Sequence, residues 1–485
     1  MSLFSISFLK PVITATVKII TASPKAIAII EIRTIGTENL LLVLSAEIIR
    51  FAINRSVFNL FSKFVDRKNT ILIHMKILKH FILLALAINA VPAVLSQNLI
   101  KVDFITKTIN DLKVGADKTE AYLPMLKDKS VAIVANQSSM IGKIHLADSL
   151  INRGVKVAKV FCPEHGFRGI VDAGKPVDTY KDDKTGLTIS SLYGKNKKPS
   201  PELLNDVDVV IFDIQDVGVR FYTYLSTLHY VMEACAENGK QVILLDRPNP
   251  NGYYIDGPVM EDAYKSFLGL HPVPIVYGMT IGEYAQMING EGWLKDHVKC
   301  NLKVITLQGY IHSDLYQLPV NPSPNLRNMT SVYLYPSLGL FEGTVVSVGR
   351  GTDLPFQVIG HPTLQNTIPP GKKEGYTFIP QPKPGAMEPK YKGQVCYGYN
   401  LATFGDVYIK YLKKIYLFWL MQTYKNTPDK ATFFDTNFNY HAGNATLQKQ
   451  IKDGVSETDI RKSWEEGISN FKTVRKKYLL YSDFE

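Results

Sequence analysis

Five short apolar runs constrain the fold of this chain more than any other feature of its sequence. The runs lie at residues 131–134, 155–161, 207–212, 242–245 and 302–307. Continuous apolar runs of this length are typical of parallel strands that are buried on both faces. Helical patterns separate them, and alternation of strands and helices predicts right-handed βαβ units. The sequence therefore predicts an α/β fold with a Rossmann-like, doubly wound and mostly parallel sheet.

Two of the intervening segments carry clear helix signals. Residues 222–237 place four apolar side chains on one stripe, and Gly239 follows as a cap. Residues 280–289 begin with Thr280 and carry Glu283 three positions later, which is the pattern of a capping box. We expect a helix in each segment.

The pattern changes after a proline-rich stretch at 319–324. Residues 363–395 are rich in Pro, Lys and Gly and are predicted to be loop, whereas residues 399–424 and 456–477 are predicted to be helical. A chain of 485 residues is too long for one ordinary core. We therefore expect a Rossmann-like domain at 115–325 and a smaller C-terminal α+β domain at 326–485.

The first 96 residues have a different character. Residues 75–96 begin with Met75 and two lysines, continue with an apolar stretch and end on the small residue Ser96, as a secretory signal peptide does. A signal peptide must be N-terminal to work, so we expect translation to start at Met75 and residues 1–74 to be a non-native upstream extension. The apolar stretch is short for a membrane anchor. The sequence predicts an exported protein, periplasmic or secreted, without a stable anchor.

Bulk composition excludes several classes of protein. With 46% hydrophobic and 20% charged residues, the chain is globular rather than disordered. The formal net charge of +11 comes from scattered basic residues, so we expect no nucleic-acid partner. The four cysteines are widely spaced among apolar neighbours and form no C-x-x-C pair, which favours buried free thiols.

Polar residues follow most of the predicted strands directly. In an open parallel sheet, ligands bind in the crevice beyond the carboxyl ends of the strands. One polar residue there is often only a helix cap, but four consecutive strand ends with polar groups favour a binding site. The residues are Asn136, Glu164, His165, Asp213, Gln215, Asp216, Asp246, Arg247 and Asn249.

Residues 163–169, PEHGFRG, form the most informative of these strand ends. Glu164 directly follows a buried strand and lies among glycines that let the backbone approach a ligand. A partly buried carboxyl group at this place suits a general acid. The alternative is a structural role in which Glu164 pairs with Arg168 or His165. No second histidine lies four residues from His165, so no metal site is expected.

Residues 213–224 are equally rich in polar groups. Asp213 and Asp216 are candidates for acid–base chemistry or for orienting ligand hydroxyls. Arg220 is a candidate for a bidentate pair with a substrate carboxylate. Tyr222 and Tyr224 either stack on a ligand ring or pack at the start of a helix.

Three further candidates follow the proline-rich stretch. Asn325 closes that stretch, and Glu342 and Arg350 lie in or beside a glycine-rich segment at 339–351. This segment lacks the phosphate-loop pattern, and no G-x-G-x-x-G follows the first predicted strand. We therefore expect neither a dinucleotide nor any other cofactor.

Long segments of the chain resemble the exo-β-N-acetylmuramidase family, formerly catalogued as a domain of unknown function. They are VANQSS (134–139), PEHGFRG (163–169), AGKPVD (173–178), TGLTISSLYG (185–194), FDIQDVGVRFYTYLSTL (212–228), LDRPNPNG (245–252), GPV (257–259), SPN (323–325), FEGTVVSVGRGTDLPFQVIG (341–360) and RKKYLLY (475–481). They span nearly all of residues 115–485, and blocks as long as FDIQDVGVRFYTY are highly specific.

The resemblance implies removal of terminal, non-reducing N-acetylmuramic acid (MurNAc) from peptidoglycan fragments. It also implies a Rossmann-like and a smaller domain with the active site in the cleft between them. Glu164 is then the leading catalytic residue. Many members carry a Glu at the position of Val348, so Glu342 or Asp216 becomes the better second candidate in this chain.

Glycoside hydrolysis usually needs two carboxyl groups, one of which protonates the leaving oxygen. Our hypothesis gives this acid role to Glu164. The second group is one of Asp213, Asp216 and Glu342, or else the N-acetyl group of the substrate itself. An arginine is expected to bind the lactyl carboxylate that distinguishes MurNAc from GlcNAc. The candidates for this contact are Arg220, Arg247 and Arg350.

Two alternatives from other classes stay open at this point. The first is another cell-wall hydrolase on the same scaffold, an amidase or deacylase with a Ser or Cys nucleophile or a metal. The second is a non-catalytic protein that binds muropeptides.

Overall fold

The computed structural model describes residues 112–169, 171, 172, 174, 175, 179–366 and 375–485, together with the backbone of three strands near the N-terminus. Those strands are β1 (Ser5–Ser7), β2 (Ala15–Ile20) and β3 (Ile29–Thr34), and they form an antiparallel sheet. Residues 1–107 and 108–485 are separate compact units. The predicted signal peptide at 75–96 lies outside the described residues, as does most of the predicted upstream extension at 1–74.

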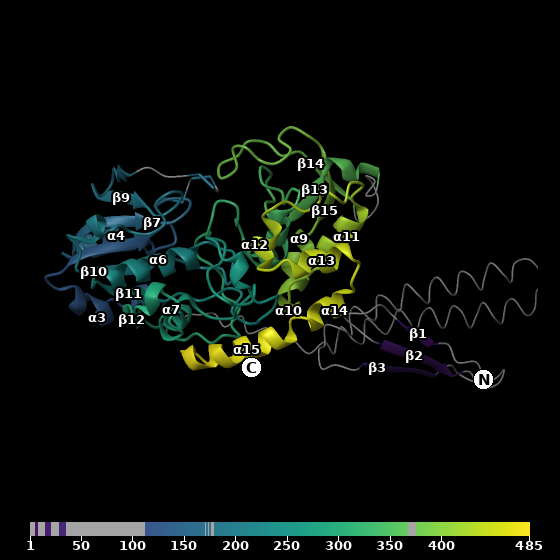
Figure 1. The fold of residues 1–485 in the computed structure, drawn as a ribbon, viewed down its shortest axis with the longest axis horizontal. Helices are drawn as coiled ribbons and strands as arrows, with labels where there is room; N and C mark the ends of the chain where they lie inside the picture. Colours follow the sequence, from purple (N-terminus) through teal and green to yellow (C-terminus); the bar gives the residue numbers. More distant parts are fainter. Residues whose placement is uncertain are drawn as a thin grey trace, which may run out of the picture. The chain divides into compact units, whose positions relative to one another are not determined.

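The parts of the larger unit before and after the predicted boundary at residue 325 are called the first and the second half here. A seven-stranded sheet, in the order β12-β11-β10-β4-β7-β9-β8, forms the first half (Figure 1). All neighbouring strands are parallel except β8 and β9. The strands are β4 (Ser130–Ala135), β7 (Lys156–Cys162), β8 (Tyr180–Lys181), β9 (Thr188–Ser191), β10 (Val209–Asp213), β11 (Gln241–Leu245) and β12 (Asn301–Ile305). Numbered along the chain, the parallel strands follow the Rossmann order 3-2-1-4-5-6. The predicted fold class is confirmed.

Each of the five apolar runs forms a strand of this sheet, as the sequence predicts. The two strands at the β8 edge were not predicted. β9 has the short and mostly polar sequence TISS, which carries no apolar run.

Helices cover both faces of the sheet and build most of the second half. They are α3 (Thr119–Tyr122), α4 (Leu146–Asn152), α5 (Pro201–Leu204), α6 (Tyr224–Glu237), α7 (Ile281–Gly290), α8 (Met329–Leu338), α9 (Ala402–Phe404), α10 (Lys410–Leu412), α11 (Phe418–Asn426), α12 (Phe438–Ala442), α13 (Thr446–Lys452), α14 (Glu457–Lys462) and α15 (Glu465–Arg475). Side chains of β4 alternate between two cores: Ala132 and Val134 pack with residues of α6 and α7, and Val131 and Ile133 with residues of α4. This alternation is what a doubly wound sheet requires.

The two predicted helices of the first half are confirmed. Gly239 follows the end of α6 with φ +64°, a left-handed conformation that suits a glycine cap. In α7 the Thr280 side chain accepts from the Glu283 N–H while the Glu283 carboxylate accepts from the Thr280 N–H at 2.8 Å.

The second half contains an antiparallel sheet in the order β13-β15-β14. Its strands are β13 (Val358–His361), β14 (Tyr376–Phe378) and β15 (Cys396–Asn400), so β14 falls within the segment predicted as loop. The helix predicted over 399–424 is wrong at its start, because Tyr399 belongs to β15. It is also interrupted after α10, where Lys413 takes φ +48°. Residues 456–477 are helical as predicted, but they form α14, α15 and a final short turn.

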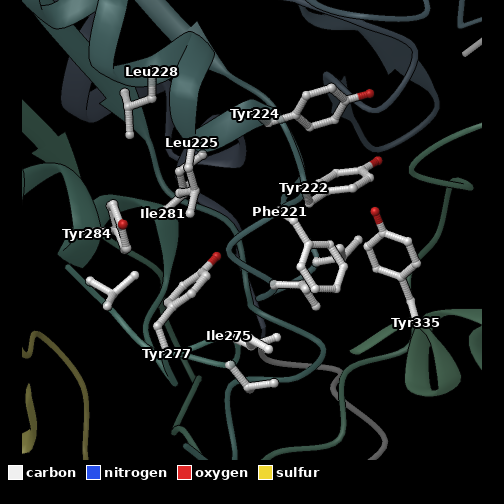
Figure 2. Packing of buried hydrophobic residues seen from close by; sticks show 14 of the residues in the cluster. Phe221, Tyr222, Tyr224, Leu225, Leu228, Ile275, Tyr277, Ile281, Tyr284 and Tyr335 are labelled. Atoms are coloured by element: carbon white, nitrogen blue, oxygen red, sulfur yellow. The ribbon is translucent and has the colours of Figure 1, made fainter. Parts of the chain in front are cut away.

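The two halves share one hydrophobic core. Phe221 and Tyr222, which precede α6, make edge contacts with Tyr335 of α8, with ring centroids 5.4 and 5.8 Å apart (Figure 2). The cluster continues from the sheet face under α6 and α7 into the helices of the second half. The halves are therefore packed as one body.

The C-terminal residues return to the first half after α15. The Tyr481 hydroxyl donates to Asp246 at the end of β11 (2.5 Å) and accepts from the Leu307 N–H (2.9 Å). The Leu480 N–H donates to the buried Glu283 carboxylate at 2.7 Å. The last residues of the chain thus complete the polar end of the Rossmann sheet.

Two smaller expectations concern the cysteines and the membrane. All four cysteines are free and buried, as predicted. In the described part of the chain, no helix has the length and apolar character needed to span a bilayer.

Candidate active site

A cleft of about 400 Å³ opens between the two halves. The first half contributes the loops after β7 and β9 and the start of α6. The second half contributes α8, the segment 342–356 and the loop 385–390. The residues that line it are Glu164, His165, Asp172, Gly174, Lys175, Tyr193, Phe221, Tyr222, Thr223, Leu268, Ser323, Leu326, Tyr335, Glu342, Arg350, Phe356, Gly385, Ala386, Met387, Glu388, Pro389, Lys390 and His441. Of the sequence-predicted residues, five line this cleft: Glu164, His165, Tyr222, Glu342 and Arg350.

Glu164 lies just beyond the carboxyl end of β7, and both of its carboxylate oxygens are held. Oε1 accepts from the Gly174 N–H at 2.9 Å, and Oε2 accepts from the Thr223 hydroxyl at 2.9 Å. The turn that presents it is tight, because His165 and Gly166 both have positive φ, +72° and +77°. A non-glycine residue rarely takes this conformation, so the turn at His165 is strained. The half-buried carboxylate is thereby fixed in the cleft.

Two ring side chains lie close to Glu164. The His165 ring is buried and its Nδ1 bonds to the Val171 carbonyl at 2.8 Å. Burial lowers the pKa of His165, although the neighbouring Glu164 carboxylate opposes this shift. Burial, and then the Glu164 charge, raise the pKa of Tyr193 above its usual value. Both rings are therefore neutral near pH 7.

Glu342 supplies a second carboxylate from the other half of the molecule. It forms an ion pair with Arg350 at 2.7 Å, and both side chains are about one-quarter exposed, at 22% and 25%. Burial alone raises the pKa of Glu342, but the charges of Arg350 and His441 outweigh it, and the pKa is lowered overall. Glu342 is consequently ionised at neutral pH. Arg350 is bound by the described residues only at Nη2, and its guanidinium stacks over Phe356 at 5.0 Å.

Asp213 and Asp216 do not line the cleft. Asp213 is fully buried in a two-point ion pair with Arg247, at 2.6 and 2.9 Å. Asp216 accepts from the Gly218 N–H (2.6 Å) and from the Tyr277 hydroxyl, and burial raises its pKa to about 6. In this geometry both aspartates fasten the turn after β10 and neither faces a ligand.

Arg220 differs most from the sequence expectation. Instead of facing a substrate carboxylate, it is 1% exposed and donates to backbone carbonyls of Pro258 and Val273 at 2.8 and 2.7 Å. Its Nη2 donates to the carbonyls of His441 and Ala442 in the second half, at 3.1 and 2.6 Å. Burial lowers the pKa of Arg220 to about 9. Arg220 therefore ties the two halves together from within.

The other predicted residues do not line the cleft, apart from Tyr222. Arg168 forms a two-point pair with Asp182 and stacks on Phe167, so its guanidinium is already occupied. Tyr222 and Tyr224 both donate to the Pro322 carbonyl, at 2.9 and 3.2 Å. The rest form hydrogen bonds inside the protein, most of them to other segments; these are Asn136, Gln215, Asp246, Arg247, Asn249 and Asn325.

Sequence reasoning missed several residues of the cleft. Thr223 lies between the two tyrosines that were singled out, and only its contact with Glu164 reveals its importance. Tyr193 lies in TGLTISSLYG, which carried the resemblance but was given no role. Lys390 and His441 come from segments without any motif, and they enter the cleft only through the fold of the second half.

A Rossmann-type sheet with a held carboxylate beyond a strand end, and a second carboxylate across a polar cleft, is the arrangement of a hydrolase that uses acidic side chains. Comparison with known proteins identifies the family. Residues 131–330 match the family model "Exo-beta-N-acetylmuramidase NamZ, N-terminal", and residues 333–481 match its C-terminal counterpart. The chain belongs to the exo-β-N-acetylmuramidase NamZ family.

Individual relatives agree with this assignment. The chain is 38% identical over 377 residues to peptidoglycan β-N-acetylmuramidase NamZ of Bacillus subtilis. The match covers 74% of this chain and 89% of the relative. Two crystal structures of DUF1343 family proteins from Bacteroides fragilis are similar, with 44% and 30% identity and TM-scores of 0.70 and 0.64. They cover 77% and 76% of this chain, and 99% of each of those chains is matched.

Proposed function

We infer that this chain is an exo-acting glycosidase that releases terminal, non-reducing MurNAc from peptidoglycan fragments. The observation that carries the proposal is the Glu164 carboxylate, held by Gly174 and Thr223 in a cleft that also contains Glu342. A glycosidase of the usual kind needs acidic groups on both sides of the scissile bond, and these two come from opposite halves of the molecule.

Arg350 is the arginine best suited to recognise the lactyl carboxylate. Of the three arginines considered from the sequence, Arg220 and Arg247 are buried and occupied, whereas Arg350 lines the cleft. A guanidinium binds a carboxylate through two parallel N–H groups, and the unengaged edge of Arg350 offers this geometry. The positive Lys390 beside it adds to the attraction for an anionic sugar.

The test is Glu164→Gln in the purified protein, assayed with a MurNAc–GlcNAc disaccharide and a chromogenic MurNAc glycoside. We expect wild type to release MurNAc and the variant to lose at least about 100-fold in kcat, in line with removal of a catalytic acid or base. Glu237→Gln, in α6 and remote from the cleft, is the matched control and keeps full activity. Near-wild-type release by Glu164→Gln removes Glu164 from the mechanism. Release of a peptide or an acyl group instead of MurNAc supports the amidase or deacylase alternative.

We also propose that the chain is exported, to the periplasm or the medium. The support is the charged, apolar and small-residue pattern of residues 75–96. N-terminal sequencing of the mature protein from fractionated cells should begin at Gln97. Retention of the full-length chain with the cytoplasmic fraction would contradict export.

A further inference from the structure

We propose that Thr223 is a positioning residue that holds the Glu164 carboxyl group in a fixed orientation during catalysis. The proposal rests on the glycosidase function inferred above and assigns a role to a residue that the sequence analysis did not single out. Its basis is the 2.9 Å hydrogen bond from the Thr223 hydroxyl to Oε2 of Glu164, which joins the start of α6 to the turn after β7.

Thr223 does not use its hydroxyl in the way usual for its position. It occupies the N-cap position of α6, where a threonine side chain commonly accepts from a backbone N–H of the first turn. Here the side chain makes no such cap bond. The hydroxyl is instead directed into the cleft at Glu164, so it is available to serve the carboxylate.

The residues on both sides of Thr223 are anchored by hydrogen bonds. Tyr222 and Tyr224 each donate a hydroxyl hydrogen to the same Pro322 carbonyl, at 2.9 and 3.2 Å. Figure 2 shows the rings of Tyr222 and Tyr224 with their hydroxyl groups directed toward the same side. Because Thr223 is β-branched and only 8% exposed, its side chain has little rotamer freedom of its own. The hydroxyl is therefore a fixed point rather than a mobile donor.

Glu164 is held at both oxygens from two different segments of the chain. The Gly174 N–H donates to Oε1, and the Thr223 hydroxyl bonds to Oε2 from the start of α6. Because the two bonds reach opposite oxygens, together they set the rotation of the carboxyl group about its Cγ–Cδ bond. Without the Thr223 hydroxyl, Oε2 loses this contact and the orientation is less defined.

Thr223→Val tests the proposal, because valine keeps the shape and removes the hydroxyl. We expect kcat for the chromogenic MurNAc glycoside to fall about 10- to 100-fold, the usual worth of a hydrogen bond to a charged group, with KM changed less than about threefold. Thr223→Ser restores the hydroxyl and should recover most of kcat.

Thr227→Val is the matched control. Thr227 lies one turn further along α6 and is fully buried, and among the described residues its hydroxyl bonds to the Thr223 carbonyl alone, at 3.4 Å. We expect its kcat to resemble wild type, and the free energies of unfolding of the two valine variants to be similar.

Two results would overturn the positioning role. They are wild-type kcat in Thr223→Val, or a Thr223→Ser variant as impaired as Thr223→Val. Should Thr223→Val fail to fold, Thr223→Ser and Thr223→Ala in the same assay decide the question through recovery of the hydroxyl. A wild-type protein that releases no MurNAc is a different outcome, which refutes the proposed function itself.

Discussion

Arg247 binds both carboxylate oxygens of Asp213 beneath the carboxyl ends of β10 and β4, with the two side chains 3% and 0% exposed. Asp213→Ala leaves a buried guanidinium without its partner, and we expect the free energy of unfolding to fall by about 3–5 kcal/mol. Urea denaturation followed by circular dichroism measures this loss. Asp206→Ala, which breaks an ion pair with Lys159 at a carboxylate that is 63% exposed, should cost less than about 1 kcal/mol. A stable but inactive Asp213→Ala would instead support a catalytic Asp213.

The sequence predicts that Arg220 binds a substrate carboxylate, whereas in the structure Arg220 is buried and bonds to backbone carbonyls. Arg220→Met strands four backbone carbonyls in the core, so we expect a loss of several kcal/mol in stability. Gly443→Ala should destabilise the protein as well, because Gly443 has φ +80° and a Cβ there would lie 2.4 Å from Nη2 of Arg220. Thermal denaturation of both variants is the measurement. A well-folded Arg220→Met whose only defect is a raised KM would favour direct substrate binding.

Arg350→Lys keeps the positive charge but loses the planar pair of N–H donors. We expect the inhibition constant of free MurNAc to rise about 10- to 100-fold, because a bidentate contact with its carboxylate is lost. That of GlcNAc, which lacks the lactyl group, should stay within about threefold. Arg327→Lys, outside the cleft lining, is the control. Equal weakening of both sugars would show that Arg350 does not read the lactyl group.

A buried histidine pair should make stability depend on pH. His229 and His271 are hydrogen-bonded at 3.0 Å, and burial lowers the pKa of both, that of His271 well below its usual value. Both histidines accept protons more readily in the unfolded chain, so this contribution is present above about pH 6.5 and is lost as pH falls below it. Each adds a slope of up to about 1.4 kcal/mol per pH unit.

Comparison of wild type with His271→Gln isolates the histidine contribution to the pH dependence of stability. The comparison is needed because burial raises the pKa values of Asp216 and Asp246 to about 6 and 7, and these shifts change stability with pH in the opposite direction. We expect His271→Gln to flatten the decline in unfolding free energy between pH 6.5 and 5. Urea titrations of both proteins at several pH values measure it. Parallel slopes for wild type and variant would contradict the assignment.

Tyr481→Phe removes the hydroxyl that bonds to Asp246 and to the Leu307 N–H. We expect a loss of about 1–3 kcal/mol, since two buried groups lose a partner. Tyr440→Phe, at a ring that is 38% exposed, should be nearly neutral. Thermal melts of the two variants provide the comparison, and equal melting temperatures would argue against a stabilising role for the C-terminal segment.

The sequence predicted the Rossmann half well because buried parallel strands leave an unambiguous apolar pattern. The residues 131–134 and 242–245, for example, lie within β4 and β11. It predicted Tyr399 poorly, since an apolar and aromatic segment fits a strand and a helix equally well before its neighbours are known.

The candidate site was predicted in outline but not in detail. Glu164 was found because it follows a strand directly, and the structure places it in the cleft. At the other strand ends, the sequence alone could not separate structural from catalytic polar residues. A buried aspartate such as Asp213, which pairs with Arg247, has the same local sequence pattern as a catalytic aspartate. Lys390 and His441 reach the cleft through long-range packing, which leaves no local pattern.

The return of the C-terminal residues to the Rossmann sheet has a consequence for the order of folding. Asp246 and Glu283 are buried polar groups whose partners Tyr481 and Leu480 are made some 200 residues later. Within the first half, Thr280 already bonds to both carboxylates, so during synthesis each of them lacks only the additional partner that residues 480 and 481 supply. Loss of residues 480 and 481, by nonsense mutation or by proteolysis, should consequently weaken the end of β11 and the start of α7, some 200 residues earlier in the chain.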